Sequence, residues 1–137
     1  MTNPTSAVNP SPASLDALGA LADNDAIIMV NLLQFRGAGG ETRYRKYGAV
    51  AGPEIAKRGG RVIYSGKRVD LPQLSSPGWD AVALVFYPNR AAYLDMQDSE
   101  AYQAAIPDRT AGLERRLLYA FKRGLTLAGA KAPDLLD

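Results

Sequence analysis

Asn31 stands in the middle of the segment IIMVNLLQF, residues 27–35, in which nearly all other side chains are apolar. This composition predicts a buried strand, so the amide of Asn31 is expected to be shielded from water. A buried amide without a partner costs about 1–3 kcal/mol. Two interpretations are open. The amide bonds to backbone or to a neighbouring helix, or it faces a pocket and holds the carbonyl or enolate oxygen of a ligand.

Arg109 and Asp80 are the other two side chains that we expect to act in catalysis. Arg109 lies seven residues after Tyr102 in a predicted helix, so the two side chains can point the same way. An arginine in a small apolar site favours an anionic group such as a carboxylate or a phenolate. The alternative is a salt bridge at the edge of the domain, with Asp80, Asp108 or Glu114 as the acidic partner.

Aromatic residues supply the walls that a site for an aromatic or carbonyl compound needs. Tyr44 and Tyr47 are one turn apart in a predicted helix, and Trp79 opens a predicted strand that should lie beside the first one. In that strand Ala81 and Ala83 leave a shallow place, which either a closely packed helix or a ligand fills. We therefore expect a ligand to contact Tyr44, Tyr47, Tyr64, Trp79 and Tyr102, although each of these also has a purely structural explanation as a core side chain.

The chain has no His and no Cys, which excludes several kinds of chemistry. Ser-His-Asp and Cys-His catalysis cannot be built within one chain, and a tight zinc site or a His-ligated haem is not expected. A metal would need oxygen ligands only, and the acidic residues Asp95, Asp98 and Glu100 are better explained as a solvated helix junction. Proton transfer would have to use a carboxylate such as Asp80 or Glu54, a phenol, or the substrate's own oxyanion. We therefore expect neither a metal nor a cofactor.

The bulk composition indicates one globular domain. The chain has 137 residues, of which 47% are apolar, and this is enough to form a core without disulfides. Its net charge of +2 is only mildly basic, and no stripe of basic and aromatic residues predicts a nucleic-acid partner. The first 13 residues do not have the pattern of a signal peptide, and no apolar run is long enough to span a membrane. A cytoplasmic protein is the expectation.

The periodicity of the sequence predicts an alternation of helices and strands. A short helix is expected over 14–21 with Ser14 as its N-cap. A second helix should end near Gly59 after a kink at Gly52-Pro53, and a third should begin at Asn89, restart at Asp98-Ser99 and kink at Pro107. Strands are expected over 26–35, 61–70, 79–87 and 113–123 of a domain covering 14–123, with a mobile tail at 1–13 and a second tail at 124–137.

After the leading helix, the order of elements is β-α-β-β-α-β, which predicts an α+β ferredoxin-like fold with an antiparallel four-stranded sheet. The first and third strands should be central. Both are apolar on both faces, whereas one face of a lone two-layer sheet should be wet. Helices on one face and a second copy of the chain on the other resolve this conflict. The pattern therefore predicts a face-to-face homodimer.

Four blocks of the sequence together resemble an uncharacterised family, domain of unknown function 1330, over about residues 14–122. They are VNLLQF, RYRKYGAVAGPEIAKRGGRVIYSGK, WDAVALVFYPNRAAYLDM and SEAYQAAIPDRTAGLE. The resemblance implies the dimeric α/β-barrel superfamily, and with it the fold and the dimer. That superfamily includes cofactor-free quinone-forming monooxygenases, muconolactone isomerases, haem-degrading oxygenases and chlorite dismutases. The haem branch typically uses a His ligand, which this chain lacks, and the resemblance implies no particular reaction.

Two functions are compatible with these residues. The first is a cofactor-independent enzyme, of oxygenase or isomerase type, that acts on a small aromatic or carbonyl compound. The second is a dimer that binds a metabolite without catalysis, or one whose interior is filled and whose role is structural. An enclosed cavity between the sheet and the helices would argue against the filled, structural dimer.

Overall fold

The computed structural model describes residues 8–72 and 78–122. The elements are α1 (Pro12–Gly19), β1 (Ile27–Phe35), α2 (Gly40–Lys57), β2 (Arg61–Lys67), β3 (Ala81–Tyr87), α3 (Arg90–Asp98), α4 (Glu100–Gly112) and β4 (Leu113–Lys122). The expected C-terminal tail, and residues 1–7 of the expected N-terminal tail, lie outside the described residues. Within them, no helix is long and apolar enough to cross a membrane.

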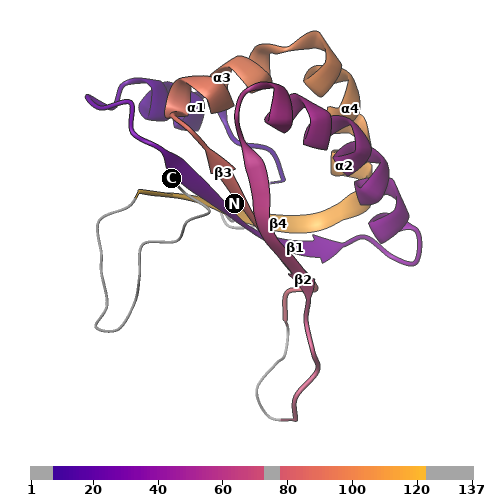
Figure 1. Ribbon diagram of the computed structural model, residues 1–137. Coiled ribbons are helices and arrows are strands. Elements are labelled where there is room, and N and C mark those ends of the chain that lie inside the picture. Colours follow the sequence, from indigo (N-terminus) through magenta and orange to yellow (C-terminus); the bar gives the residue numbers. More distant parts are fainter. Residues whose placement is uncertain (1–7, 73–77, 123–137) are drawn as a thin grey trace.

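The four strands form one antiparallel sheet in the order β2-β3-β1-β4 (Figure 1). The central strands are thus the first and the third, which confirms the predicted ferredoxin-like arrangement. In this register Asn31 lies opposite Ala83 on β3 and opposite Leu118 on β4. The most conspicuous polar residue of β1 is therefore at the centre of the sheet.

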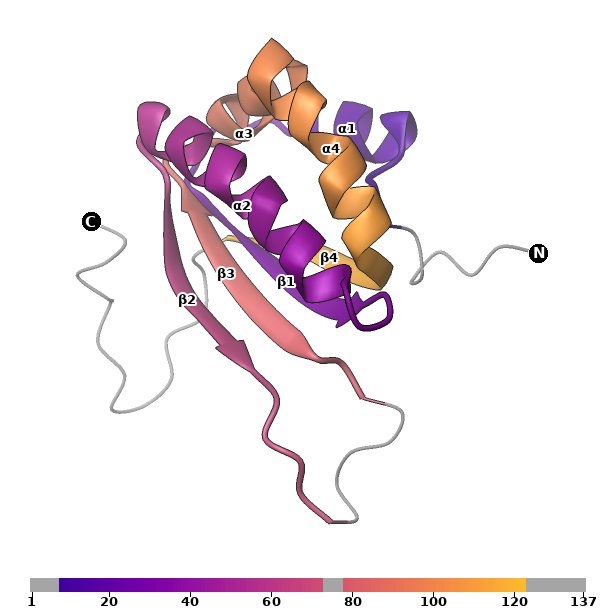
Figure 2. The same cartoon turned by 90° about the vertical axis from the view of Figure 1, so that its right-hand side faces the viewer.

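All four helices lie on the same side of the sheet (Figure 2). Alternate residues of β1, beginning with Ile27 and Met29, are buried beneath them with Tyr47 of α2 and Tyr93 of α3. The residues of β1 between these point to the opposite face, where they are only half-buried. Among the described residues no helix covers that face, so an apolar sheet surface remains open.

Several boundaries differ from the sequence prediction. The first helix begins at Pro12 instead of 14, and its N-cap is Ser11 instead of Ser14, because Pro12 at the first helical position fits the helix and needs no hydrogen-bond acceptor. Residues 8–11, which lead into this helix, are among the described residues. Strand β2 ends at Lys67 and strand β3 begins at Ala81, so both are shorter than expected.

The caps of the later helices agree with the prediction. The side chain of Asn89 accepts a hydrogen bond from the amide of Ala92, and that of Ser99 accepts one from Tyr102 at the start of α4. Gly59 follows α2 with a φ of 80°, a left-handed conformation that suits glycine. Helix α2 nevertheless runs without a break through Pro53, because both Pro53 and Ala49, whose carbonyl loses its partner, are exposed to water.

Two glycines allow α2 and α4 to cross closely. A Cβ atom on Gly40 would lie 2.6 Å from the carbonyl oxygen of Gly112, and one on Gly112 would lie 2.7 Å from the carbonyl oxygen of Gly40. Because these are backbone atoms, a side chain at either position would force the helices apart. The crossing brings Tyr47 of α2 within reach of Arg109 of α4.

The same substitution at two positions of α2 should have opposite effects on stability. Gly40→Ala should lower the free energy of unfolding by about 1–3 kcal/mol, because the crossing with Gly112 cannot hold a Cβ. Gly48→Ala should raise it by about 0.5–1 kcal/mol, because a Cβ there meets no atom within 4 Å and the glycine loses more entropy on folding. Urea unfolding of both variants tests this. Equal effects would contradict the close crossing.

Candidate functional site

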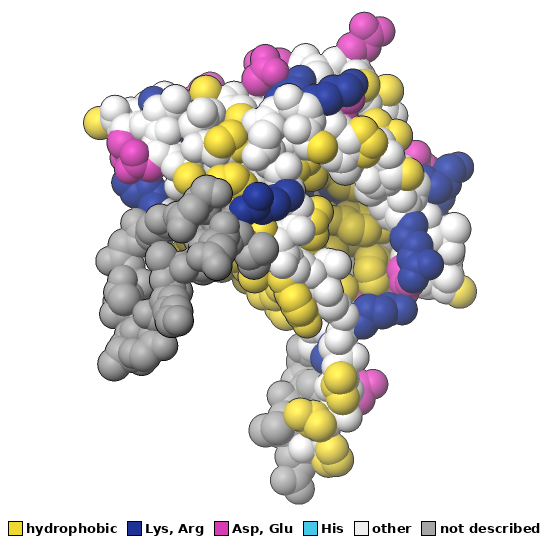
Figure 3. Space-filling view, in the orientation of Figure 1, with side chains coloured by type: hydrophobic (Ala, Val, Ile, Leu, Met, Phe, Trp, Pro, Cys, Tyr) yellow, Lys and Arg dark blue, Asp and Glu magenta, His cyan; other side chains and the backbone are white. Residues whose placement is uncertain are grey.

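A cavity of about 200 Å³ lies between the sheet and helices α2 and α4. In Figure 3 the surface is hollowed between the helical layer and the sheet, and hydrophobic side chains line the hollow. Asn31, Tyr44, Tyr47, Tyr102 and Arg116 supply most of the polar groups in the cavity wall. Four of these five residues were predicted from the sequence as catalytic or substrate-binding residues. Arg116 was not.

Arg116 of β4 is the main partner of Asn31. The Oδ1 atom of Asn31 accepts hydrogen bonds from Nε and Nη2 of Arg116, at 3.1 and 2.7 Å. Its Nδ2 atom donates to the carbonyl oxygens of Ala83 and Met29, at 3.3 and 3.4 Å. The amide is thus satisfied by strand β4 and by backbone, and not by a helix. It also borders the cavity, so a role toward a ligand remains a prediction.

Arg116 was missed although the sequence carries a signal for it. In a strand, side chains alternate between the two faces, so Arg116 shares a face with Leu118 and Ala120, the face that the helices cover. Only 6% of Arg116 is exposed, and its Nη1 atom donates to the carbonyl oxygen of Val8 at 3.0 Å. A basic residue on the buried face of a predicted strand is the pattern that could have identified it.

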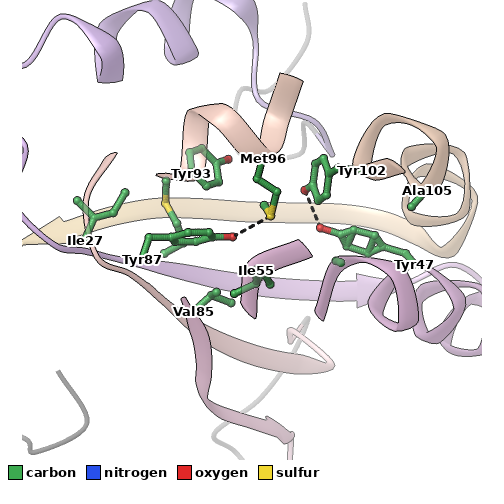
Figure 4. Packing of buried hydrophobic residues seen from close by; sticks show 11 residues of the cluster. Ile27, Tyr47, Ile55, Val85, Tyr87, Tyr93, Met96, Tyr102 and Ala105 are labelled. Atoms are coloured by element: carbon green, nitrogen blue, oxygen red, sulfur yellow. Dashed lines mark hydrogen bonds between the residues drawn. The ribbon is translucent and has the colours of Figure 1, made fainter. Parts of the chain in front are cut away.

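Arg109 lies at the centre of a second polar cluster and is 1% exposed. It donates from Nη1 to the hydroxyl oxygens of Tyr47 and Tyr102, which are themselves 2.7 Å apart (Figure 4). Its Nε and Nη2 atoms donate to Oδ1 of Asn9, at 3.2 and 2.7 Å. Although burial opposes the charge, the interactions with Tyr102 and Tyr47 raise the pKa of Arg109 above its usual value.

The salt bridge considered for Arg109 is not formed. Asp108 instead pairs with Arg43 at 2.8 Å, and Glu114 pairs with Arg36 at 3.3 Å, both near the surface. The physical reason is geometric, because Arg109 points from α4 toward α2 and the cavity, whereas these carboxylates point outward. Among the described residues, neither Arg109 nor Arg116 has a carboxylate partner.

Burial disfavours the ionised form of four phenols in the cavity wall. Burial raises the pKa of Tyr44, Tyr47 and Tyr87 above that of a free phenol. Burial also raises the pKa of Tyr93 to about 12. Neutral phenols can donate hydrogen bonds to an oxygen of a ligand, and they are poor bases. The wall of the cavity therefore offers donors and positive charge.

The two carboxylates considered as bases lie elsewhere. Asp80 accepts a hydrogen bond from the amide of Phe35 at 2.8 Å, which fixes the end of β1. Glu54 forms ion pairs with Lys57 and Arg58, and hydrogen bonds from these two residues lower the pKa of Glu54. Neither carboxylate borders the cavity, and its described wall contains no acidic side chain.

Trp79 and Tyr64 do not join the cluster around Asn31. Tyr64 is 57% exposed on the edge strand β2. With Trp79 it borders a separate hollow of about 160 Å³ on the opposite face of the sheet, next to Leu32 and Val82. The guanidinium carbon of Arg115 lies 4.0 Å from the centre of the Trp79 ring. Of the two aromatic residues at the ends of the segment 79–87, Tyr87 borders the cavity at Asn31 and Trp79 does not.

The acidic residues at the junction of α3 and α4 do not gather around one point. Asp95 forms an ion pair with Arg58 at 2.7 Å. Among residues 8–72 and 78–122, no group of three acidic side chains could hold a metal ion. The polar groups of the cavity wall are phenols, the hydroxyl of Ser65, the amide of Asn31 and the guanidinium of Arg116, a set that suits an anion better than a cation.

Asn31 and Arg116 should be strongly coupled in their effect on stability. Asn31→Ala leaves the buried N–H groups of Arg116 unpaired and should cost about 1–3 kcal/mol of unfolding free energy. The double variant with Arg116→Met should lose less unfolding free energy than the sum of the two single losses, by about 0.5–3 kcal/mol. Urea unfolding of the single and double variants measures this coupling.

A matched control pair lies on the same two strands but on the other face. Arg115 donates from Nε to Oε1 of Gln34 at 2.9 Å, and both residues are only half-buried. Gln34→Ala and Arg115→Met should therefore show a smaller coupling. Additive losses for Asn31 and Arg116 would mean that their hydrogen bonds contribute little.

The geometry can be compared with known proteins. No curated protein matches the chain significantly. Among solved structures, RPA0582 from Rhodopseudomonas palustris, a protein of unknown function, has a TM-score of 0.79 and 26% identity, with 89% of this chain and 100% of that chain covered. A dimeric ferredoxin-like protein of unknown function from Jannaschia sp. CCS1 has a TM-score of 0.57 and 17% identity, with 71% of this chain and 98% of that chain covered. SnoaB from Streptomyces nogalater, a cofactor-independent oxygenase, has a TM-score of 0.53 and 14% identity, with 75% of this chain and 97% of that chain covered.

These similarities agree with the ferredoxin-like fold, and at identities this low the second and third concern the fold alone. The match to a family model is more specific. It covers residues 38–121, from the start of α2 to the end of β4. The chain therefore belongs to the family described as Domain of unknown function (DUF1330).

Proposed function

We propose that the protein binds a small aromatic or carbonyl compound as an oxyanion in the cavity at Asn31 and Arg116. The observation that carries the proposal is the burial of the Arg116 guanidinium in the cavity wall with no carboxylate partner among the described residues. Arg109, which is buried behind the hydroxyls of Tyr47 and Tyr102, adds a second positive charge nearby. A buried cation of this kind is stabilised by an anion of matching geometry, such as a carboxylate, a phenolate or an enolate. The apolar and aromatic wall around it suits the rest of such a molecule.

The same arrangement favours a reaction without a cofactor. Positive charge and phenol donors lower the pKa of a bound phenol or enol, so that the substrate releases its proton to water and is held in its reactive anionic form inside the cavity. This replaces the base that the cavity wall lacks. The fold similarity to SnoaB, named as a cofactor-independent oxygenase, is in keeping with an oxygenase or isomerase of this type.

A non-catalytic binding protein is the second candidate. It is favoured by the absence of any acidic side chain from the described cavity wall, because no residue there can remove a proton from a weakly acidic substrate. The two candidates agree on the ligand's charge and differ only in turnover. Binding and turnover must therefore be measured separately.

The anion should be recognised by charge. Benzoate should bind at least tenfold more tightly than its uncharged methyl ester in calorimetric titrations. Asn31→Asp should abolish this preference, because the new carboxylate would pair with Arg116 while retaining the fold. Arg45→Gln, an exposed position on α2, is the control and should leave the preference unchanged. Equal binding of acid and ester by the unaltered protein would rule out the proposed anion site.

Turnover distinguishes the two candidates. For an enzyme, a naphthohydroquinone incubated with the protein in air and a metal chelator should consume oxygen faster than the protein-free solution. Arg116→Gln should remove that difference. Binding of benzoate together with no acceleration for hydroquinones or lactones would favour the non-catalytic candidate.

We further propose that the protein works as a homodimer joined through the open face of the sheet. That face carries Leu84, Leu117, Tyr119 and Phe121, and the last two are about half exposed. Soluble monomers rarely expose a continuous apolar patch of several hundred Å². The dimeric ferredoxin-like neighbour supports the proposal through its fold. The absence of cysteine is in keeping with a cytoplasmic setting for this dimer.

Light scattering at micromolar concentration should give the mass of a dimer. Leu117→Asp should convert it to a monomer, because the charge would be buried at the interface. Val50→Asp, which replaces an exposed apolar residue of α2 on the other side of the molecule, should leave the dimer intact. A monomeric mass for the unaltered protein would contradict the proposal.

A further inference from the structure

A second cavity lies under α1. It has a volume of about 300 Å³, and its wall is almost entirely apolar. Leu15, Leu18 and Leu21 border it from the helix side, and Met29, Leu118 and Ala120 border it from the sheet.

Polar contacts hold helix α1 at its two ends, and the cavity beside the helix is open to solvent at Leu21 and Ala120. Before the helix, Val8 and Asn9 accept hydrogen bonds from Arg116 and Arg109. After it, Asn24 accepts one from the amide of Ala91, and Asp23 pairs with Lys122 at 2.7 Å. None of the helix's own residues is buried. Leu15 and Leu18 are partly buried and pack against the edge of the core, and the cavity remains beside them.

The two cavities are neighbours. Met29 and Tyr93 border both of them. On the helix-covered face, Met29 is the neighbour of Asn31 along β1, and Leu118 is the neighbour of Arg116 along β4 in the same direction across the sheet. Such a step spans roughly 7 Å along a strand. An anion at Arg116 would therefore lie about one step from the edge of the apolar cavity.

The volumes also point to a joined site. The cavity at Asn31, at about 200 Å³, is smaller than the range of about 300–1,000 Å³ that is typical of ligand sites. The two cavities together fall within that range. Met29, whose flexible thioether side chain adapts easily to a new neighbour, stands between them.

We propose that the ligand is an amphiphile. Its oxyanion binds at Asn31 and Arg116, and its apolar tail passes Met29 and Tyr93 into the cavity under α1. Alkyl-substituted aromatic carboxylates and phenols have this form. The inference rests on the proposed function for the head of the ligand, and it adds the tail site and its chemistry.

A series of para-alkyl benzoates, from methyl to hexyl, tests the tail site because the head group stays the same. Affinity measured by calorimetry should rise about fourfold for each added methylene group until the cavity is filled. Leu18→Trp should fill the space under α1, so the methyl compound should still bind while the gain with chain length disappears. Val50→Trp places the same ring on an exposed position of α2 and should keep the gain.

A second variant tests the same cavity in case Leu18→Trp does not fold. Ala120→Leu narrows the same cavity from the sheet side and should reduce the gain for the longer chains only. If methyl and hexyl compounds bind equally well to the unaltered protein, the tail site is disproved while the anion site stands. If the gain persists in both Leu18→Trp and Ala120→Leu, the tail lies elsewhere and the inference is overturned. If no benzoate binds, the proposed function itself fails.

Discussion

Two charges inside the helix-covered half of the molecule set the constraint on which the rest of the structure depends. Arg109 and Arg116 are almost completely buried, and their described partners are hydroxyl, amide and carbonyl oxygens. A buried charge is tolerated only where such dipoles satisfy it. Dipoles satisfy the N–H groups but do not neutralise the charge, so the interior keeps a positive potential. That potential is the physical basis of the anion site that we propose.

The surrounding fold can be understood as the means of holding these dipoles in place. The contact of Gly40 with Gly112 brings α2 and α4 close enough for Tyr47 and Tyr102 to share the guanidinium of Arg109. The segment before α1 adds Asn9 to the same group. Residues from three separate parts of the chain therefore meet at one charge, and the helical layer is tied together by polar contacts as well as by its apolar core.

The two faces of the sheet serve different purposes. The face under the helices carries Asn31 and Arg116 among apolar neighbours, and it forms the walls of both cavities. The open face carries leucines, Tyr119 and Phe121, and it also carries the polar pair Gln34 and Arg115, of which Arg115 lies over the ring of Trp79. Alternation along β1 and β4, up to the register shift at Gln34 and Phe35, keeps these two sets apart. A shift of either strand by one residue would exchange them, so the register of the sheet determines which side chains lie under the helices and which lie on the open face.

The sequence by itself determined the elements, their order and the topology of the sheet, because the spacing of apolar residues and the caps at Asn89, Ser99 and Gly59 depend on near neighbours in the chain. It also determined that Asn31 is buried. Only the tertiary structure decided what Asn31 bonds to, since Arg116 is 85 residues away and is brought to it by the pairing of β1 with β4. In the same way, sequence could not choose between phenols and carboxylates as partners of Arg109. The candidate phenols and carboxylates are similar in their distance from Arg109 along the chain or across the fold. The direction in which α4 faces where it crosses α2 decides which of them Arg109 contacts.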